Sequence, residues 1–201
     1  MKSLKLMSVL TVLSISLLAC GGGKTVTRID PGETIDLSGY WNDTDSRLVA
    51  EEMISDCLSR PWLTNFLRDQ GKNPTVIAGS IRNKSQEHIP VGTFLLDIER
   101  EMVNSGTIQV VASSEERGEV RDERADQQVN ASKETLKQMA REVGADFMLI
   151  GEINQINDRE GGKEVKFYQV DLTLVNIETN VKAWLGQKKI KKFIGSSTYK
   201  P

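Results

Sequence analysis

The sequence Phe147-Met148-Leu149-Ile150-Gly151-Glu152-Ile153 predicts a central, largely buried β-strand, because its residues are mostly apolar and the run has the length of a strand. Two more long strands are predicted after it, over residues 165–177 and 181–193. The predicted turns between them are Gly161-Gly162-Lys163 and Glu178-Thr179-Asn180. Short connections between successive strands indicate antiparallel pairing, so this half of the chain predicts a three-stranded meander.

Helices and strands alternate in the first half of the predicted fold. Apolar residues at helical spacing predict three helices, which end near Pro61, Gly71 and Gly106. Runs rich in β-branched residues predict strands over 75–81 and 107–112. The expected fold class is therefore α/β, a three-layer-like sandwich in which helices flank a mixed, mostly antiparallel sheet of four to five strands.

The chain between the second predicted strand and the central one is less regular. Residues 115–128 are highly charged and have little apolar content, which fits either a solvated helix or a mobile excursion from the fold. Ser132 then begins a further predicted helix, which has an apolar stripe and stops at Gly144.

The amino terminus resembles the signal of a bacterial lipoprotein. A basic head, Met1-Lys2-Ser3-Leu4-Lys5, precedes an apolar run over residues 6–18 and the sequence Leu17-Leu18-Ala19-Cys20. The resemblance implies that the Cys20 sulfur receives a lipid and that the chain is cut before this residue. The alternatives are a plain signal peptide and a short membrane anchor, although the run is shorter than the ~20 residues that span a bilayer.

These features divide the chain into three expected parts. Residues 1–19 are expected to be a signal peptide, 20–37 a flexible tether and 38–195 a globular domain. Gly21, and not an aspartate, follows the cysteine, which resembles lipoproteins that are sorted to the outer membrane. The domain is thus expected to face the periplasm from a lipid anchor in the outer membrane.

The charge balance disfavours nucleic acid as a partner. The chain has 26 Lys and Arg against 28 Asp and Glu, and loss of Lys2 and Lys5 with the signal peptide lowers the formal net charge from −2 to −4. A domain that binds nucleic acid would instead show a strongly basic face.

The sequence contains no recognisable catalytic constellation. The single histidine, His88, lies in a polar segment with no nucleophile pattern beside it, and Cys57 lies on an apolar helix face that predicts a small buried residue. Cysteine–histidine spacing for zinc and a phosphate-binding glycine loop are also missing. We therefore expect that the protein is not an enzyme and that it takes no metal, cofactor or small-molecule substrate.

A lysine-rich segment, Lys188-Lys189-Ile190-Lys191-Lys192, lies near the end of the last predicted strand. Lysines on an edge strand oppose pairing between sheets of different molecules, which is one interpretation of this segment. Binding of anionic polymers of the cell envelope is the other.

Four segments occur together, in this order, in the mature chain: Ile35-Asp36-Leu37-Ser38-Gly39-Tyr40-Trp41-Asn42-Asp43-Thr44-Asp45-Ser46, Ser80-Ile81-Arg82-Asn83-Lys84-Ser85, Gly144-Ala145-Asp146-Phe147-Met148-Leu149-Ile150-Gly151-Glu152-Ile153 and Val175-Asn176-Ile177-Glu178-Thr179-Asn180-Val181-Lys182-Ala183-Trp184. With the lipoprotein signal before them, they resemble the LpoB family of penicillin-binding-protein activators, whose domain is similar to the TolB amino-terminal domain. The resemblance spans roughly residues 35–193.

The resemblance implies an outer-membrane lipoprotein that reaches through the periplasm. It would bind a bifunctional class A penicillin-binding protein and stimulate its glycosyltransferase and transpeptidase activities. The best-known members of the family carry a long proline-rich tether. Here the tether, Gly21 to Leu37, has about 17 residues with one proline and spans roughly 60 Å when fully extended.

Two other classes of function stay open at this point. One is a structural lipoprotein of envelope assembly, similar to those that serve curli secretion or the flagellar outer ring; the other is a hydrolase that acts on peptidoglycan. For contact with a protein partner the candidates are Arg82, Asn83 and Lys84, because polar loops at strand ends often carry binding residues. An ordinary solvated loop is the alternative.

Overall fold

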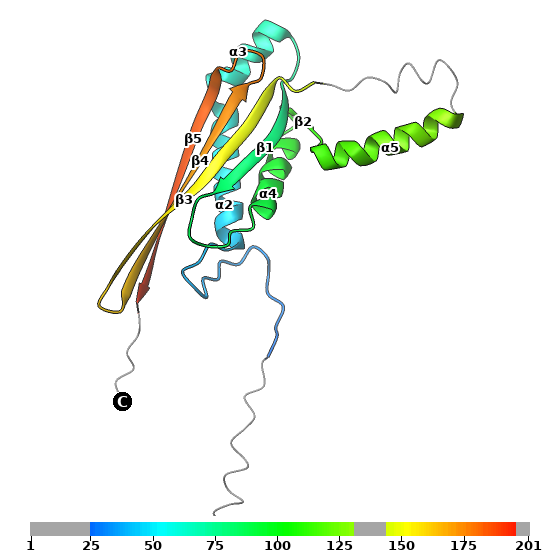
Figure 1. Cartoon of the computed structure of the whole chain (residues 1–201). Helices are drawn as coiled ribbons and strands as arrows, with labels where there is room; N and C mark the ends of the chain where they lie inside the picture. The colour runs from blue at the N-terminus through cyan, green and yellow to red at the C-terminus, as the bar shows by residue number, and fades with distance from the viewer. Residues whose placement is uncertain (1–24, 131–143, 196–201) are drawn as a thin grey trace, which may run out of the picture. The chain divides into compact units, whose positions relative to one another are not determined.

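A five-stranded mixed sheet forms the framework of the computed structural model, which describes residues 25–130 and 144–195 (Figure 1). In chain order the strands are β1 (Thr75–Asn83), β2 (Gln109–Val111), β3 (Phe147–Glu160), β4 (Lys163–Asn176) and β5 (Lys182–Gly195). Their order across the sheet is β2-β1-β3-β4-β5. The apolar run that begins at Phe147 is therefore confirmed as part of the central strand.

The pairing of the strands confirms a mixed sheet in which most pairing is antiparallel. Strand β1 runs parallel to both β2 and β3, whereas β3 with β4 and β4 with β5 pair antiparallel over most of their fourteen residues. The turns Gly161-Gly162 and Thr179-Asn180 include residues with positive φ angles, 55° and 78° at the two glycines and 59° at Asn180. Tight reversals of this kind require such angles, so the meander has the predicted connections.

The described ranges hold four helices beside the sheet: α2 (Asp43–Ser59), α3 (Pro61–Gln70), α4 (Val91–Asn104) and α5 (Ser114–Asn130). Asn42 begins α2 through a capping box, in which its side chain accepts from the Asp45 amide and the Asp45 side chain accepts from the Asn42 amide, both at 3.0 Å. Pro61 occupies the first turn of α3, and Gly71 ends this helix in the left-handed conformation. These ends agree with the sequence predictions.

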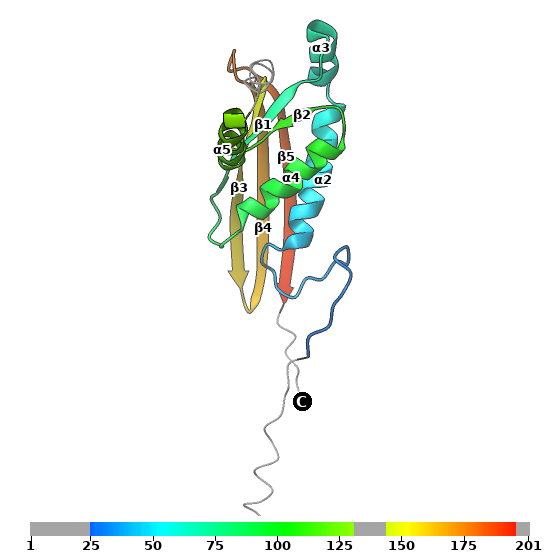
Figure 2. The ribbon, with the colours of Figure 1, turned by 90° about the vertical axis from the view of Figure 1, so that its right-hand side faces the viewer.

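Helices α2 and α4 lie side by side on one face of the sheet, where α2 contacts β5 and α4 contacts β1 and β2 (Figure 2). In the described residues no helix packs on the opposite face, so these residues form two of the three layers expected from the sequence. The α/β class with helices beside a mixed sheet is confirmed. We call the side of the sheet away from α2 and α4 the open face.

The hydrophobic core lies between the sheet and these two helices. Its buried residues include Val49 and Met53 of α2, Phe94 and Ile98 of α4, and Leu172 of β4. All buried apolar side chains among the described residues lie between Trp41 and Trp184. A soluble form that lacks the signal peptide and Cys20 therefore retains the entire described core.

Several local predictions changed or stayed open. The strand predicted over residues 107–112 is shorter, Gln109–Val111. Residues 115–128 belong to the helix α5, whose first turn is capped by Ser113, so the solvated-helix interpretation is the one that the structure bears out. The helix predicted to begin at Ser132 lies outside the described residues. None of the helices in the described ranges combines the length and apolar content that a membrane crossing needs.

Candidate functional site

The open face carries the alternate side chains of the three long strands. Cross-strand neighbours on it form rows whose composition changes along the strands. An apolar row contains Ile150, Thr173 and Leu185, and the next, polar row contains Glu152, Asp171 and Gln187. Leu185 is 64% exposed, so apolar groups on this face are in contact with solvent. A surface with both kinds of row is suited to contact with another macromolecule.

A shallow hollow of about 460 Å³ lies on the open face and crosses four strands. Residues from β1, β3, β4 and β5 line it: Ser80, Arg82, Ile150, Gly151, Glu152, Asp171, Thr173 and Lys182. Its charged groups are of both signs, and no three His, Cys, Asp or Glu side chains among the described residues gather as a metal site requires. The hollow can therefore receive a polar segment of a partner.

Arg82 and Lys84 stand at the edge of this hollow, where both form ion pairs with Glu152. The distances to Glu152 Oε2 are 3.3 Å from Arg82 Nη2 and 2.7 Å from Lys84 Nζ. The hydrogen bond from Lys84, followed by one from Asn154, lowers the pKa of Glu152 below its ordinary value. Because exposed ion pairs contribute little to stability, both cations remain available to the carboxylates of a partner.

Asn83 has a different role from its two neighbours. Its side-chain amide donates to the Glu87 carbonyl at 2.7 Å, and its Oδ1 accepts from the amide and hydroxyl of Ser85 at 2.9 and 2.6 Å. Arg82 and Asn83 are the last residues of β1, and only from Lys84 onward is the segment a loop. The expected loop thus begins two residues later than the sequence indicated, and Asn83 shapes it.

Glu87 is the centre of a buried polar cluster that sequence reasoning missed. Its carboxylate accepts from Lys166 Nζ at 2.7 Å, from the Tyr168 hydroxyl at 2.8 Å and from Gln155 Nε2 at 2.5 Å. The backbone amide of Trp41 also donates to it, at 3.2 Å. The cluster therefore joins the loop after β1, the strands β3 and β4, and the chain just before α2.

The electrostatics of the cluster favour the ionised carboxylate. Burial by itself would raise the pKa of Glu87, but the hydrogen bonds from Lys166, Tyr168 and Gln155 outweigh it and hold the pKa below its ordinary value. Burial and the neighbouring carboxylate raise the pKa of Tyr168, which keeps its hydroxyl protonated as a donor. The Lys166 ammonium also lies 3.3 Å from the centre of the Tyr40 ring.

One signal for this cluster was present in the sequence. Lys166 shares its strand face with Tyr168, Val170, Leu172 and Leu174, all of which are buried. A lysine in such an alternating apolar series requires a buried carboxylate partner. The position of that partner was not readable, since Glu87 lies 79 residues away in the sequence.

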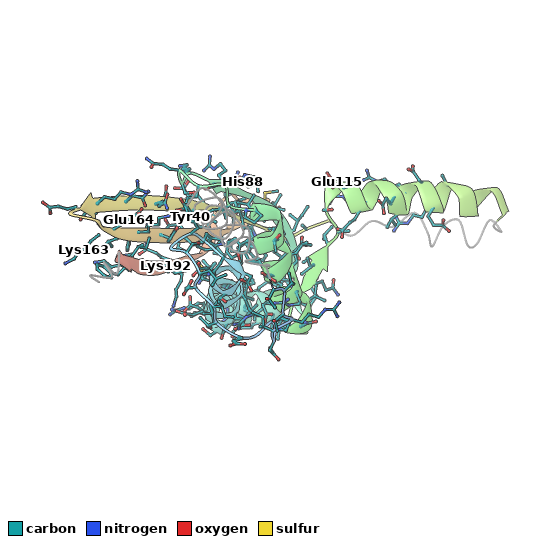
Figure 3. All side chains as sticks on the ribbon, turned by 90° about the horizontal axis from the view of Figure 1, so that it is seen from below. Tyr40, His88, Glu115, Lys163, Glu164 and Lys192 are labelled. Atoms are coloured by element: carbon teal, nitrogen blue, oxygen red, sulfur yellow. The ribbon has the colours of Figure 1, made fainter. Side chains whose placement is uncertain are left out.

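The lysine-rich segment lies in β5, which is an edge strand. Its lysines alternate between the two faces. Lys188 pairs with Glu52 of α2, and Lys192 donates to Asp45 at 2.6 Å and to Asp36 at 2.8 Å (Figure 3). Lys189 and Lys191 are exposed on the open face. Lys188 and Lys192 thus connect β5 to the helix layer, whereas Lys189 and Lys191 place positive charge along the edge of the sheet.

The two residues considered for catalysis take no part in the hydrogen bonds and ion pairs described above. His88 is exposed in the loop after β1 (Figure 3). Cys57 is buried in α2, and this burial raises the pKa of its thiol to about 12. A thiol with such a pKa is protonated and unreactive at neutral pH. Cys20, the expected lipidation site, lies outside the described residues.

The family of the chain follows from its sequence over this fold. The sequence model of the peptidoglycan-synthase activator LpoB matches residues 45–190, which extend from α2 into β5. The chain belongs to the LpoB family. No curated protein sequence matches it.

Solved structures of LpoB proteins are similar to this chain at low identity. The C-terminal domain of LpoB from Salmonella enterica has 15% identity, with 66% of this chain and 94% of that one covered and a TM-score of 0.35. LpoB from E. coli has 14% identity over 87% of this chain and 85% of that one, with a TM-score of 0.42. The lipoprotein GNA1162 from Neisseria meningitidis has 16% identity over 63% and 88%, with a TM-score of 0.39.

Proposed function

We propose that the protein is a lipid-anchored regulator of peptidoglycan synthesis that binds and stimulates a bifunctional class A penicillin-binding protein. The observation that carries this proposal is the match to the LpoB family, which covers the fold from α2 into β5. The protein acts as a regulator by binding, and not as an enzyme.

In this proposal the parts of the chain have separate tasks. Cys20 receives the lipid and holds the protein to the outer membrane, facing the periplasm. Residues 20–37 form the tether, and residues 38–195 form the domain that contacts the synthase. The open face supports a binding task, because it combines exposed apolar side chains with charged groups at the edge.

Stimulation requires that the domain binds the active form of the synthase more tightly than the resting form. A ligand shifts a conformational equilibrium only by its differential affinity for the two states. A tenfold shift needs about 1.4 kcal/mol of difference in binding free energy. A modest contact that is complete only in the active form is therefore sufficient.

The test is the rate of lipid II polymerisation by purified class A synthases of the same organism, with and without a soluble form spanning residues 21–201. We expect at least one synthase to be captured by the soluble form and to polymerise faster in its presence. The proposal is wrong if none of these synthases binds it or changes its rate.

Charge reversal at the edge of the hollow tests the two exposed candidates. We expect the double change Arg82→Glu and Lys84→Glu to weaken capture of the synthase about tenfold, because it replaces two available cations by anions. The matched control is Arg68→Glu with Arg100→Glu, whose side chains are 69% and 50% exposed, close to the 69% and 48% of Arg82 and Lys84. Equal capture by both double variants would remove Arg82 and Lys84 from the docking surface.

A further inference from the structure

Strand β5 has a long unpaired edge, and residues 36–39 line a hollow with its last residues, 191–195. It is the outermost strand of the sheet, extends over fourteen residues and pairs with β4 alone among the described residues. One set of its backbone amides and carbonyls is therefore directed away from the sheet. Such an edge is the template onto which an extended peptide adds as a further strand.

An apolar patch lies beside this edge on the open face. Ile156 and Phe167 are cross-strand neighbours, and so are Val165 and Phe193. Ile156 is 65% exposed and Phe193 is 66% exposed. We call these four residues, with Lys189 and Lys191, the distal patch. The strands β3, β4 and β5 continue past the ends of α2 and α4 toward the turn at Gly161 (Figure 1 and Figure 2). The lysines of the patch lie level with the first turns of α2, since the neighbouring Lys188 and Lys192 pair with Glu52 and Asp45.

The lysines of β5 differ in what they contact. Lys188 and Lys192 pair with carboxylates of the helix layer and the chain before it. For Lys189 and Lys191, which point to the other side, the described part of the chain supplies no carboxylate within ion-pair distance. Lys189 and Lys191 are therefore two exposed cations with which carboxylates of a partner can pair.

A second copy of the chain does not fit this edge in the register that is centred on the lysines. An antiparallel pair of β5 strands centred on Ile190 would place Lys189 opposite Lys191 and Lys188 opposite Lys192 of the other copy. Like charges directly opposite each other in a sheet are destabilising.

An anionic lipid surface is less complementary to the distal patch and to the edge of β5 than an acidic peptide is. Asp158 lies in the same row as Val165 and Phe193, and Glu160 follows it at the hairpin end, so the patch also presents negative charge to a bilayer. A lipid headgroup would furthermore leave the edge amides of β5 without partners, whereas a strand would satisfy them.

We propose that the free edge of β5 between Gln187 and Gly195 binds an extended, acidic segment of the partner protein as a sixth strand. Carboxylates of this segment pair with Lys189 and Lys191, and an apolar side chain covers Phe193. Backbone hydrogen bonds supply affinity, while the distal patch supplies specificity. The proposal rests on the proposed function in that the partner is expected to be the class A synthase.

The first experiment uses the soluble form and the synthase. We expect Lys189→Glu with Lys191→Glu, and separately Phe193→Ser, to weaken binding at least tenfold, the size typical of a central interface residue. The controls are Arg68→Glu with Arg100→Glu, and Leu96→Ser, which change exposed residues of α3 and α4 away from the patch and the open face. Hydrogen exchange is expected to slow for the amides of residues 187–195 in the complex. If stimulation persists while both patch variants bind normally and these amides stay unprotected, the inference is wrong and the proposed function stands.

The second experiment does not depend on the synthase. The probe is the peptide Thr-Val-Glu-Val-Glu-Val-Thr, and its control replaces both glutamates by lysines. We expect the acidic peptide alone to protect the amides of residues 187–195 and to lose this effect with the Lys189→Glu, Lys191→Glu variant. If no synthase responds but this result is obtained, the proposed function fails and the inference stands. Absence of protection by the acidic peptide, binding to phosphatidylglycerol vesicles in its place, or self-association through β5 would each overturn the inference.

Discussion

At the scale of single residues, Glu87 and Lys166 form the most deeply buried ion pair in the described part of the chain. The Lys166 side chain is 2% exposed and that of Glu87 is 8% exposed. Two charges that are buried to this extent lose most of their hydration. This loss is offset only if the two groups form their ion pair and the remaining hydrogen bonds of both are made. The cluster around them is complete, because Tyr168, Gln155 and the Trp41 amide supply those bonds.

The first prediction concerns removal of one partner from this pair. Lys166→Met should lower the free energy of unfolding by about 3 kcal/mol, because it leaves Glu87 buried without its cation. The double variant Lys166→Met, Glu87→Gln should regain part of this loss, since no charge then stays buried. Urea denaturation of the soluble forms measures both. Losses that simply add in the double variant would contradict the account of a coupled pair.

The second prediction concerns pH. The pKa of Glu87 is below its ordinary value of 4.5 in the folded state, so its ionised form stabilises the fold. This contribution is present above pH 4.5 and is lost as the pH falls below 4.5 through the folded-state pKa. The difference in stability between the unmodified soluble form and Glu87→Gln should therefore shrink from pH 6 to pH 3.5. Denaturation curves at the two pH values test this, and a constant difference would contradict it.

At the scale of elements, two helices begin with the same motif in different surroundings. A capping box starts α2 at Asn42, and a second one starts α5 at Ser113, where Glu116 Oε2 accepts from the Ser113 amide at 2.7 Å. Helix α2 contributes buried residues to the core. Helix α5 is polar, and its residues whose side chains are described are exposed or half-buried (Figure 3).

The third prediction follows from this difference. Asn42→Ala should lower the free energy of unfolding of the whole domain by about 1 kcal/mol, because the fold cannot form without α2. Ser113→Ala should reduce helix content and leave the unfolding midpoint nearly unchanged. Circular dichroism and urea denaturation give the two quantities. An equal shift of the midpoint in both variants would show that α5 is part of the cooperative unit.

The elements that the sequence predicted well are those with local signals. Pro61 and Gly71 punctuate the first helices, and the turn at Gly161 separates two long strands, so their ends were readable. The end of β1 was not readable, because Arg82 and Asn83 begin a polar run that is typical of a loop, although both pair with β3. The open face and the Glu87 cluster depend on contacts between distant segments. For the cluster the sequence pattern shows Lys166 but not its partner, 79 residues away.

At the scale of the whole molecule, a short piece of chain joins the proposed anchor to the domain. Asp36 in this piece contacts the domain, where it accepts from Asn42 at 2.6 Å and from Lys192 at 2.8 Å. About sixteen residues separate it from Cys20, which corresponds to roughly 55 Å when extended and to about 20–24 Å as a flexible coil. With Cys20 lipidated as proposed, the domain must begin within this distance of the membrane, and a bound synthase can lie farther out only by the extent of the domain itself.

The fourth prediction separates the two cysteines. Cys20→Ser should abolish incorporation of a palmitate analogue and prevent removal of residues 1–19, because the cut before a lipoprotein cysteine follows its lipidation. Cys57→Ala should leave both unchanged, because this thiol is buried within α2. Labelling of growing cells followed by gel electrophoresis measures the two properties. Labelling of the Cys20→Ser protein, or its shortening to the mature length, would contradict the proposed anchor.

The bonds of Lys192 have a mechanical consequence. Its ammonium group holds Asp36, the Tyr40 carbonyl and Asp45, at 2.8, 3.1 and 2.6 Å, and so ties the start of the domain to the end of β5. With Cys20 lipidated and a synthase bound as proposed, tension along the tether would reach Asp36 before it reaches the core. Rupture of the Asp36–Lys192 ion pair would release only the few residues up to Tyr40, whose carbonyl Lys192 also binds, and the domain would stay folded.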